Sequence, residues 1–287
     1  MRGFPTIALS AGLLLLLNVP LRAGEFTIIP DVVYGHKAGM ALTYDVIRPE
    51  KQNGAGVLFI VSGGWVSTWI PPESIIRKNT KTPNVHEALV DKGYTLFLVR
   101  HGSSPYFKVP DAVSDVRRAV RFIRAHQSDY GIDADRLGVY GFSAGGHLTL
   151  MLGTTSDEGN PNAKDPVDRV SNRVAAIVAV VAPTKLADLF PLKQRFVALD
   201  FPQEQEVSVS PLEHASKDDA AALLIYGEKD DLVPLSHGER MAKAFEKEGA
   251  PHELLIISGA GHAFKGIEQV QMQEALLNWF DQHLLKK

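Results

Sequence analysis

The stretch "RLGVYGFSAGGHLTL", residues 136–150, decides the fold. It starts as an apolar run typical of a buried strand, passes a serine flanked by small residues, and continues as a helix-like run. A strand-to-helix turn this short must be sharp, and Gly141 and Gly145 provide the room that crowded backbone needs. The sequence therefore predicts that Ser143 stands in a strained turn that lifts its hydroxyl out of a sheet.

Apolar runs like the one before Ser143 recur along the chain. Continuous runs, which indicate strands buried on both faces, lie at 56–64, 94–102, 136–142, 174–183, 221–230 and 252–261. An alternating run at 40–49 indicates an antiparallel strand. Helical patterns lie between the runs, at 85–93, 111–127, 144–154, 235–250 and 267–286. This alternation predicts an α/β fold, a mostly parallel central sheet with helices on both faces.

Two stretches interrupt this alternation. Residues 156–173 form a long polar loop, and residues 184–219 are longer than a strand-to-helix connection needs. Long insertions at the carboxyl edge of such a sheet are usually lids or binding loops, so 184–219 is predicted to be a lid-like insertion. The alternative is a surface excursion that only covers the sheet.

The N-terminal residues resemble an export signal. Arg2 precedes an apolar stretch that is short for a membrane span, and a small Ala23 suits a cleavage site. We therefore expect residues 1–23 to be a signal peptide and residues 24–287 to be a single domain. The protein is then secreted or periplasmic, with no stable membrane association after cleavage. The alternative is an uncleaved N-terminal anchor.

The composition excludes several kinds of chemistry. The 287 residues carry a formal net charge of −3 and include no cysteine. Disulfides, thiolate nucleophiles and Cys-ligated metals are therefore excluded. Acidic and basic residues are interspersed without a basic run, so nucleic acid is not an expected partner.

A serine is a poor nucleophile unless a base and an orienting acid accompany it. Asp230 and Asp231 follow the apolar run at 221–230, and His262 follows the next run in a glycine-rich loop. Both positions lie at strand carboxyl ends, as Ser143 does, so the three side chains should converge. We predict Asp230 as the acid because it comes directly after the strand and its turn, with Asp231 as the alternative.

The other histidines are weaker candidates for the base. His147 lies one turn into the helix after the serine and is expected to be a packed, hydrogen-bonded residue. His101 ends a strand and is a candidate for lining the substrate site. His36 and His86 have no context that links them to Ser143.

A developing oxyanion needs backbone N–H groups aimed at it. The N–H of Ala144, at the start of a helix, is one candidate. The stretch "VSGGWVSTW" (61–69) follows a strand and offers the N–H groups of Gly64 and Trp65. Trp65 and Trp69 are candidates for binding the substrate; the alternative is that they cover the core.

With these features the chain resembles the α/β-hydrolase serine esterases and lipases, in the feruloyl-esterase-like and hormone-sensitive-lipase-like branch, which is related to prolyl oligopeptidase catalytic domains. The resemblance spans roughly residue 40 to the end. It rests on "SGGW" (62–65), "YGIDADRLGVYGFSAGGHL" (130–148), "ASKDDAAALLIYGEKDDLVP" (215–234) and "GAGHAF" (259–264). It implies Ser143 as nucleophile, Asp230 as acid, His262 as base and an oxyanion loop at 63–65.

The chain departs from the family pattern at two places. The family usually has a histidine before the glycine pair, where this chain has Ser62. It also has "VRHGSSP" (99–105) where "YRL" is usual. The first departure concerns the bracing of the loop, and the second concerns the shape of the pocket.

We therefore expect a serine carboxylic-ester hydrolase that needs no cofactor and no metal. Its substrates would be small or medium esters, free or linked to polysaccharide, with acetyl and feruloyl esters as candidates. An amide or peptide hydrolase with the same triad, such as an aryl-formamidase, is the alternative. A non-catalytic binding protein on a hydrolase scaffold is the alternative of another class. The sequence does not indicate an oligomeric state.

Overall fold

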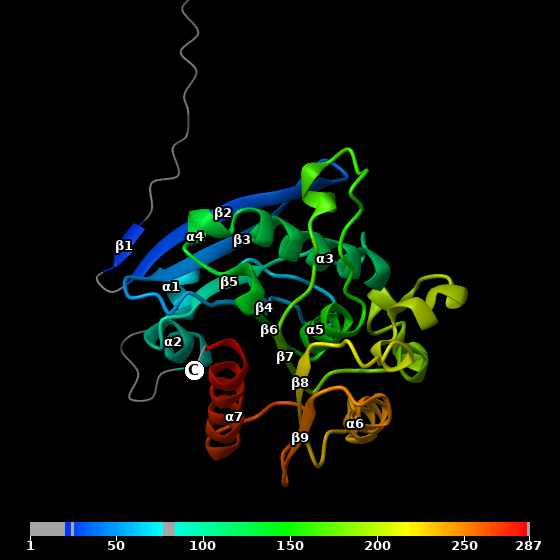
Figure 1. The fold of residues 1–287 in the computed structure, drawn as a ribbon. Coiled ribbons are helices and arrows are strands. Elements are labelled where there is room, and N and C mark those ends of the chain that lie inside the picture. The colour runs from blue at the N-terminus through cyan, green and yellow to red at the C-terminus, as the bar shows by residue number, and fades with distance from the viewer. Residues whose placement is uncertain (1–20, 24–25, 77–83, 286–287) are drawn as a thin grey trace, which may run out of the picture.

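A computed structural model describes residues 21–23, 26–76 and 84–285, and it is built around a nine-stranded sheet (Figure 1). The strands are β1 (Leu21–Ala23), β2 (Phe26–Lys37), β3 (Met40–Pro49), β4 (Gly56–Ile60), β5 (Thr95–Val99), β6 (Leu137–Phe142), β7 (Ala176–Val180), β8 (Ala221–Gly227) and β9 (His252–Ile257). Their order is β1-β2-β3-β5-β4-β6-β7-β8-β9. In this spatial order, the pairs from β1 through β2 and β3 to β5 are antiparallel. The pairs from β5 through β4, β6, β7 and β8 to β9 are parallel. The predicted mostly parallel sheet, with an antiparallel strand at 40–49, is confirmed.

Helices cover both faces of this sheet, as predicted (Figure 1). They are α1 (Pro72–Ile75), α2 (Val85–Asp91), α3 (Val109–Ala125), α4 (Gln127–Tyr130), α5 (Ala144–Thr154), α6 (Ser236–Glu248) and α7 (Ile267–Leu284), with short 3₁₀ turns η1 (Ala134–Arg136) and η2 (Pro166–Arg169). Buried side chains of α2 and α7 belong to one apolar cluster, and those of α3, α5 and α6 belong to the other.

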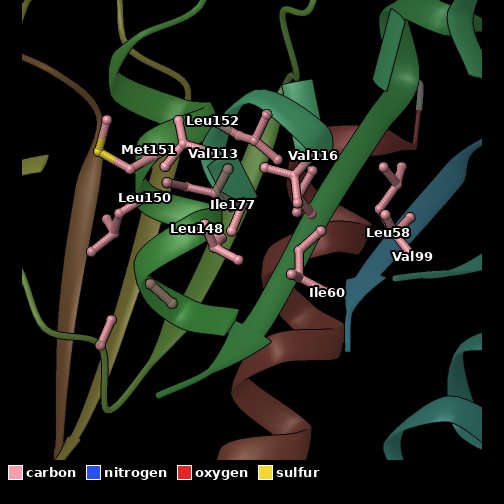
Figure 2. Packing of buried hydrophobic residues seen from close by; sticks show 14 of the residues in the cluster. Leu58, Ile60, Val99, Val113, Val116, Leu148, Leu150, Met151, Leu152 and Ile177 are labelled. Atoms are coloured by element: carbon pink, nitrogen blue, oxygen red, sulfur yellow. The ribbon is translucent and has the colours of Figure 1, made fainter. Parts of the chain in front are cut away.

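The junction between β6 and α5 is held by the core. Figure 2 shows Val116 of α3 and Leu148 of α5 packed with Leu58 and Ile60 of β4 and Ile177 of β7, all fully buried. Burying an aliphatic side chain of this size stabilises a fold by about 1.5–3 kcal/mol. The turn that carries Ser143 therefore starts and ends in well-packed elements.

The long segment 184–219 contains five 3₁₀ helices: η3 (Leu186–Leu192), η4 (Val197–Leu199), η5 (Gln203–Gln205), η6 (Val207–Val209) and η7 (Pro211–Glu213). It packs against α3, α5 and α6. Its two ends are tied together, because the N–H of Leu212 donates to the carbonyl of Thr184 at 3.0 Å. That the segment acts as a lid stays a prediction.

The predicted signal peptide lies mostly outside the described residues, which begin at Leu21. Its last three residues form β1, which pairs antiparallel with β2. None of the helices in the described part of the chain is long and apolar enough to cross a lipid bilayer.

Candidate active site

Ser143 occupies the turn between β6 and α5 with φ 53° and ψ −118°, a conformation that L-residues seldom adopt. The surrounding glycines are sterically required. A Cβ on Gly141 would lie 2.4 Å from the carbonyl oxygen of Gly145, and one on Gly145 would lie 2.7 Å from the carbonyl oxygen of Ile60. Close backbone packing that only glycine permits therefore keeps Ser143 in its strained conformation. This conformation presents the serine hydroxyl above the edge of the sheet.

The structure brings Ser143, His262 and Asp230 into one hydrogen-bonded chain. Asp230 follows β8 and His262 follows β9, so both lie at the same sheet edge as the serine. The Oγ of Ser143 is 3.0 Å from Nε2 of His262, and Nδ1 of His262 is 2.7 Å from Oδ2 of Asp230. This is the order of contacts that an activated serine needs.

Asp230 is fixed in place as an ionised acid. Its other oxygen, Oδ1, accepts the N–H groups of Leu232 and Val233, each at 2.9 Å. Burial raises the pKa of Asp230, but hydrogen bonds with His262 and the N–H of Val233 outweigh burial and hold that pKa below its usual value. The alternative acid, Asp231, is exposed and makes no hydrogen bond to His262.

The ionised Asp230 fixes the tautomer of His262. A carboxylate only accepts hydrogen bonds, so Nδ1 of His262 carries the proton that points to Asp230. In that tautomer, Nε2 offers its lone pair to the hydroxyl of Ser143. The arrangement can take the serine proton and later return it to a leaving group.

The loop after β4 supplies backbone donors beside Ser143. Gly63 and Val66 exchange two hydrogen bonds of 3.0 Å and close a tight loop, in which Gly64 and Trp65 have φ of 57° and 60°. Within the described residues, the N–H groups of Gly64 and Trp65 have no acceptor. Ala144 begins α5, so its N–H has no acceptor inside the helix. All three predicted oxyanion donors are thus unengaged.

The indole of Trp65 is anchored by His147, and both side chains are buried. Trp65 Nε1 donates to His147 Nδ1 at 3.2 Å, and His147 Nε2 donates to the carbonyl of Val209 at 2.7 Å. Burial lowers the pKa of His147 to about 4, so the ring is neutral at physiological pH. The expectation that His147 is packed and hydrogen-bonded is confirmed.

Two predicted substrate-binding residues are not brought to Ser143. Trp69 is 55% exposed, and with His101 it lines a separate cleft of about 470 Å³ whose lining does not include Ser143. The segment after the Gly63–Val66 bridge contacts the loop that follows β5, where the N–H of Ser67 donates to Oγ of Ser103 at 2.8 Å. His101 instead braces Ser62, with its Nε2 2.8 Å from the serine Oγ.

A cavity of about 1000 Å³ opens beside Ser143 and His262. It mixes apolar and polar side chains, and sequence analysis assigned none of those beyond the triad to the site. They include, in chain order, Ser74, Ile75, Asn84, Val85, His86, Phe142, Phe264, Gln269, Val270 and Met272. α2, α7 and the loop before α7 supply most of this lining, because the core packs these two helices together on one face of the sheet.

His86 is the histidine among these lining residues that were not predicted from the sequence. Its Nδ1 is 2.5 Å from the hydroxyl of Tyr140, a fully buried side chain on β6 whose pKa burial raises well above the usual range. The phenol is therefore protonated, and within the described residues Nδ1 of His86 is its one acceptor. Burial lowers the pKa of His86 to about 4, so the neutral ring keeps its proton on Nε2. Nothing in the sequence links α2 to Ser143.

Among residues 21–23, 26–76 and 84–285, no group of three or more histidine, aspartate or glutamate side chains could hold a metal ion.

The chain order serine, acid, histidine on a largely parallel sheet is that of the α/β-hydrolases, and this chain is an α/β-hydrolase of the esterase and lipase branch. Its residues 44–245 match the model of the BD-FAE family, and the chain belongs to that family.

Individual relatives agree with this placement. A probable carboxylic ester hydrolase, LipM of Mycobacterium tuberculosis, is 29% identical over 71% of this chain and 48% of its own length. The truncated form of a carbohydrate esterase from gut microbiota superposes with a TM-score of 0.69 at 22% identity, over 91% of this chain and 99% of its own. An acetyl ester-xyloside bifunctional hydrolase from Caldicellulosiruptor lactoaceticus superposes with a TM-score of 0.68 at 24% identity, over 88% of this chain and 93% of its own. The chain spans about half the length of the curated relative.

Proposed function

We propose that this protein is a serine carboxylic-ester hydrolase that acts through Ser143, His262 and Asp230. One observation carries the proposal: a continuous hydrogen-bonded chain runs from the buried carboxylate through the imidazole to the strained serine. Membership of the BD-FAE family and similarity to a probable carboxylic ester hydrolase support it.

The proposed reaction has two halves. His262 Nε2 takes the proton as Ser143 Oγ attacks the ester carbonyl, and the oxyanion is stabilised by the N–H groups of Gly64, Trp65 and Ala144. His262 then protonates the leaving alcohol, and an acyl-enzyme remains on Ser143. Water, deprotonated by the same imidazole, attacks the acyl carbon, the bond to Ser143 Oγ breaks, and the imidazole returns the proton to Oγ as the acid leaves. Asp230 stabilises the imidazolium in both halves.

The proposed substrates are small or medium esters whose alcohol part is free or linked to polysaccharide. One structural neighbour is named a carbohydrate esterase and another an acetyl ester-xyloside bifunctional hydrolase, and these names support this class. Export to the periplasm or medium would suit such substrates and is also proposed. N-terminal sequencing of the mature protein tests it, with Gly24 expected as the first residue.

Hydrolysis of p-nitrophenyl esters by wild-type protein and Ser143→Ala tests the reaction. We expect the variant to fold and to lose turnover by about a thousandfold or more. Mass spectrometry after a brief acetyl-ester pulse should find an acetyl group on Ser143 in the wild type only. Turnover that survives in Ser143→Ala would exclude the proposed nucleophile. Hydrolysis of an amide but not of its matched ester would favour the amidase alternative.

A further inference from the structure

The space around Ser143 is divided into two unequal parts. The cavity of about 1000 Å³ is lined by both Ser143 and His262. A second space lined by Ser143 is a recess of only about 10 Å³. Its lining includes Gly64, Trp65, Ser143, Phe196 and Val233 but not His262.

The position of His262 assigns the two parts of an ester to these spaces. The imidazole that takes the serine proton must return it to the leaving oxygen, so that oxygen lies within hydrogen-bond reach of Nε2. The alcohol part therefore extends into the cavity that His262 lines. The carbonyl oxygen points to the donors of Gly64, Trp65 and Ala144, which leaves the recess for the acyl substituent.

The size of the recess limits that substituent. A volume of about 10 Å³ is close to what one water molecule needs, so a methyl group is the largest alkyl group that fits unless the wall moves. The walls formed by Trp65 and Val233 are fixed, because both side chains are at most 3% exposed and sit in the core.

Phe196 is the wall that the insertion contributes. It lies just before η4 and is partly buried. Its ring meets the indole of Trp65 edge to face at 6.3 Å between centroids, and a Cβ on Gly64 would lie 2.9 Å from the ring. Its backbone is anchored by hydrogen bonds to Leu192 and Leu199 at 2.9 Å each, so the side chain rather than the chain path closes the recess.

We propose that Phe196 limits the acyl group to about the size of acetyl, while a bulky, hydroxyl-rich alcohol occupies the cavity beside His262. The side chains of His86 and Gln269 in the cavity lining suit hydroxyl groups, whereas those of Ser74 and Asn84 already hydrogen-bond to backbone groups. This inference rests on the proposed ester hydrolysis. Ser143 Oγ bonds to the acetyl carbon, the bond from that carbon to the alcohol oxygen breaks, and His262 passes the serine proton to that oxygen. Water then loses a proton to His262 and bonds to the acetyl carbon, the bond from that carbon to Ser143 Oγ breaks, and His262 returns the proton to Oγ as acetic acid leaves.

Values of kcat/KM for p-nitrophenyl acetate, butyrate and hexanoate test the acyl limit, because the leaving group is constant. Wild-type protein should hydrolyse the butyrate at least about tenfold less efficiently than the acetate. Phe196→Ala should raise the butyrate-to-acetate ratio by about tenfold or more, and Phe196→Leu should raise it less. Val197→Ala, at an exposed neighbouring position, should keep the wild-type ratio.

Several outcomes would overturn the inference. Wild-type preference for hexanoate would place the acyl chain in the large cavity, and so would an unchanged ratio in folded Phe196→Ala. If Phe196→Ala does not fold, the ratio measured with Phe196→Leu decides. In each case, loss of turnover in Ser143→Ala would show that the ester hydrolysis itself stands. Failure of wild-type protein on every ester would instead overturn the proposed function and this inference together.

The alcohol part is tested with the acyl group held constant. We expect kcat/KM for a monoacetylated disaccharide to exceed that for ethyl acetate by about tenfold or more, because the disaccharide contacts much more of the cavity lining than an ethyl group does and has hydroxyl groups to bind there. Equal values would overturn the assignment of a hydroxyl-rich alcohol to the cavity.

Discussion

His147 accepts the indole N–H of Trp65 through Nδ1 at 3.2 Å and uses its other nitrogen to hold the carbonyl of Val209 at 2.7 Å. One neutral imidazole thus joins three parts of the site: the oxyanion loop, the helix that follows Ser143, and the insertion 184–219. The loop conformation, with Trp65 at φ 60°, is unfavourable for a bulky residue by itself. The hydrogen bond from Trp65 to His147 therefore helps to keep the N–H groups of the oxyanion loop in position.

We expect His147→Phe to lower kcat by about 10- to 100-fold with a small change in KM, because oxyanion donors act mainly in the transition state. Steady-state kinetics on one ester measure both constants. His237→Phe is the matched control, since that histidine is also buried but contacts Thr184 instead of the oxyanion loop. It should lose stability while kcat stays the same. An unchanged kcat in folded His147→Phe would show that the loop holds its shape without the anchor.

Asp230→Asn should lower kcat by about ten-thousand-fold, because an amide no longer selects the tautomer of His262 that accepts the serine proton. Asp231→Asn provides the comparison at an exposed neighbouring carboxylate and should stay within about twofold of wild type. Ester hydrolysis by both variants at one pH measures the difference. The reverse order of effects would assign the acid to Asp231.

Gly145→Ala should destabilise the fold by about 1–3 kcal/mol or more, because its Cβ would lie 2.7 Å from the carbonyl oxygen of Ile60. Urea unfolding measures the change in the free energy of unfolding. Gly261→Ala serves as the control, since its Cβ would meet no described atom closer than 3.7 Å. Equal stability of the two variants would mean that α5 can shift away from β4.

The free energy of unfolding should fall as the pH drops from about 6.5 to about 4. Burial lowers the pKa values of His86, His147 and His237 to about 4, below the ordinary value of 6.5. The unfolded chain therefore binds more protons in this interval, and acid favours it. For fully buried His147 the loss approaches about 3 kcal/mol. Urea unfolding at several pH values measures the slope.

A pair of variants attributes this slope to the buried rings. His237→Gln should reduce the pH dependence of the unfolding free energy, whereas replacing the exposed His36 by glutamine should leave it unchanged. A slope that is the same in both variants would show that His237 does not contribute to the acid sensitivity.

The central strands and the three converging side chains were predictable because their signals are local. Strands buried on both faces read as continuous apolar runs, and Ser143, Asp230 and His262 each follow such a run. β2 was missed for a physical reason. It lies near the sheet edge, is interrupted by bulges between Ile29 and Val32 and between Val33 and Gly35, and therefore has no clean alternation.

The pocket residues were not predictable in the same way. His86 and Phe196 come from segments 57 residues before and 53 residues after Ser143, and only packing sets their distance from it. Trp69 and His101 follow strands, which made them candidates, but both line a different cleft, which does not include Ser143. Sequence pattern specifies which strand ends meet at the site, while the walls of the pocket depend on how helices and the insertion pack.

The three triad residues do not share the same support. Ser143 follows β6, which has a parallel neighbour on each side, whereas His262 follows β9, which pairs only with β8 in the described sheet. Opening of that edge would carry the base away from a serine that is still held in place. We therefore expect hydrolysis to be lost at lower denaturant concentrations than those at which circular dichroism detects unfolding. Activity would then serve as a sensitive gauge of one sheet edge rather than of the whole domain.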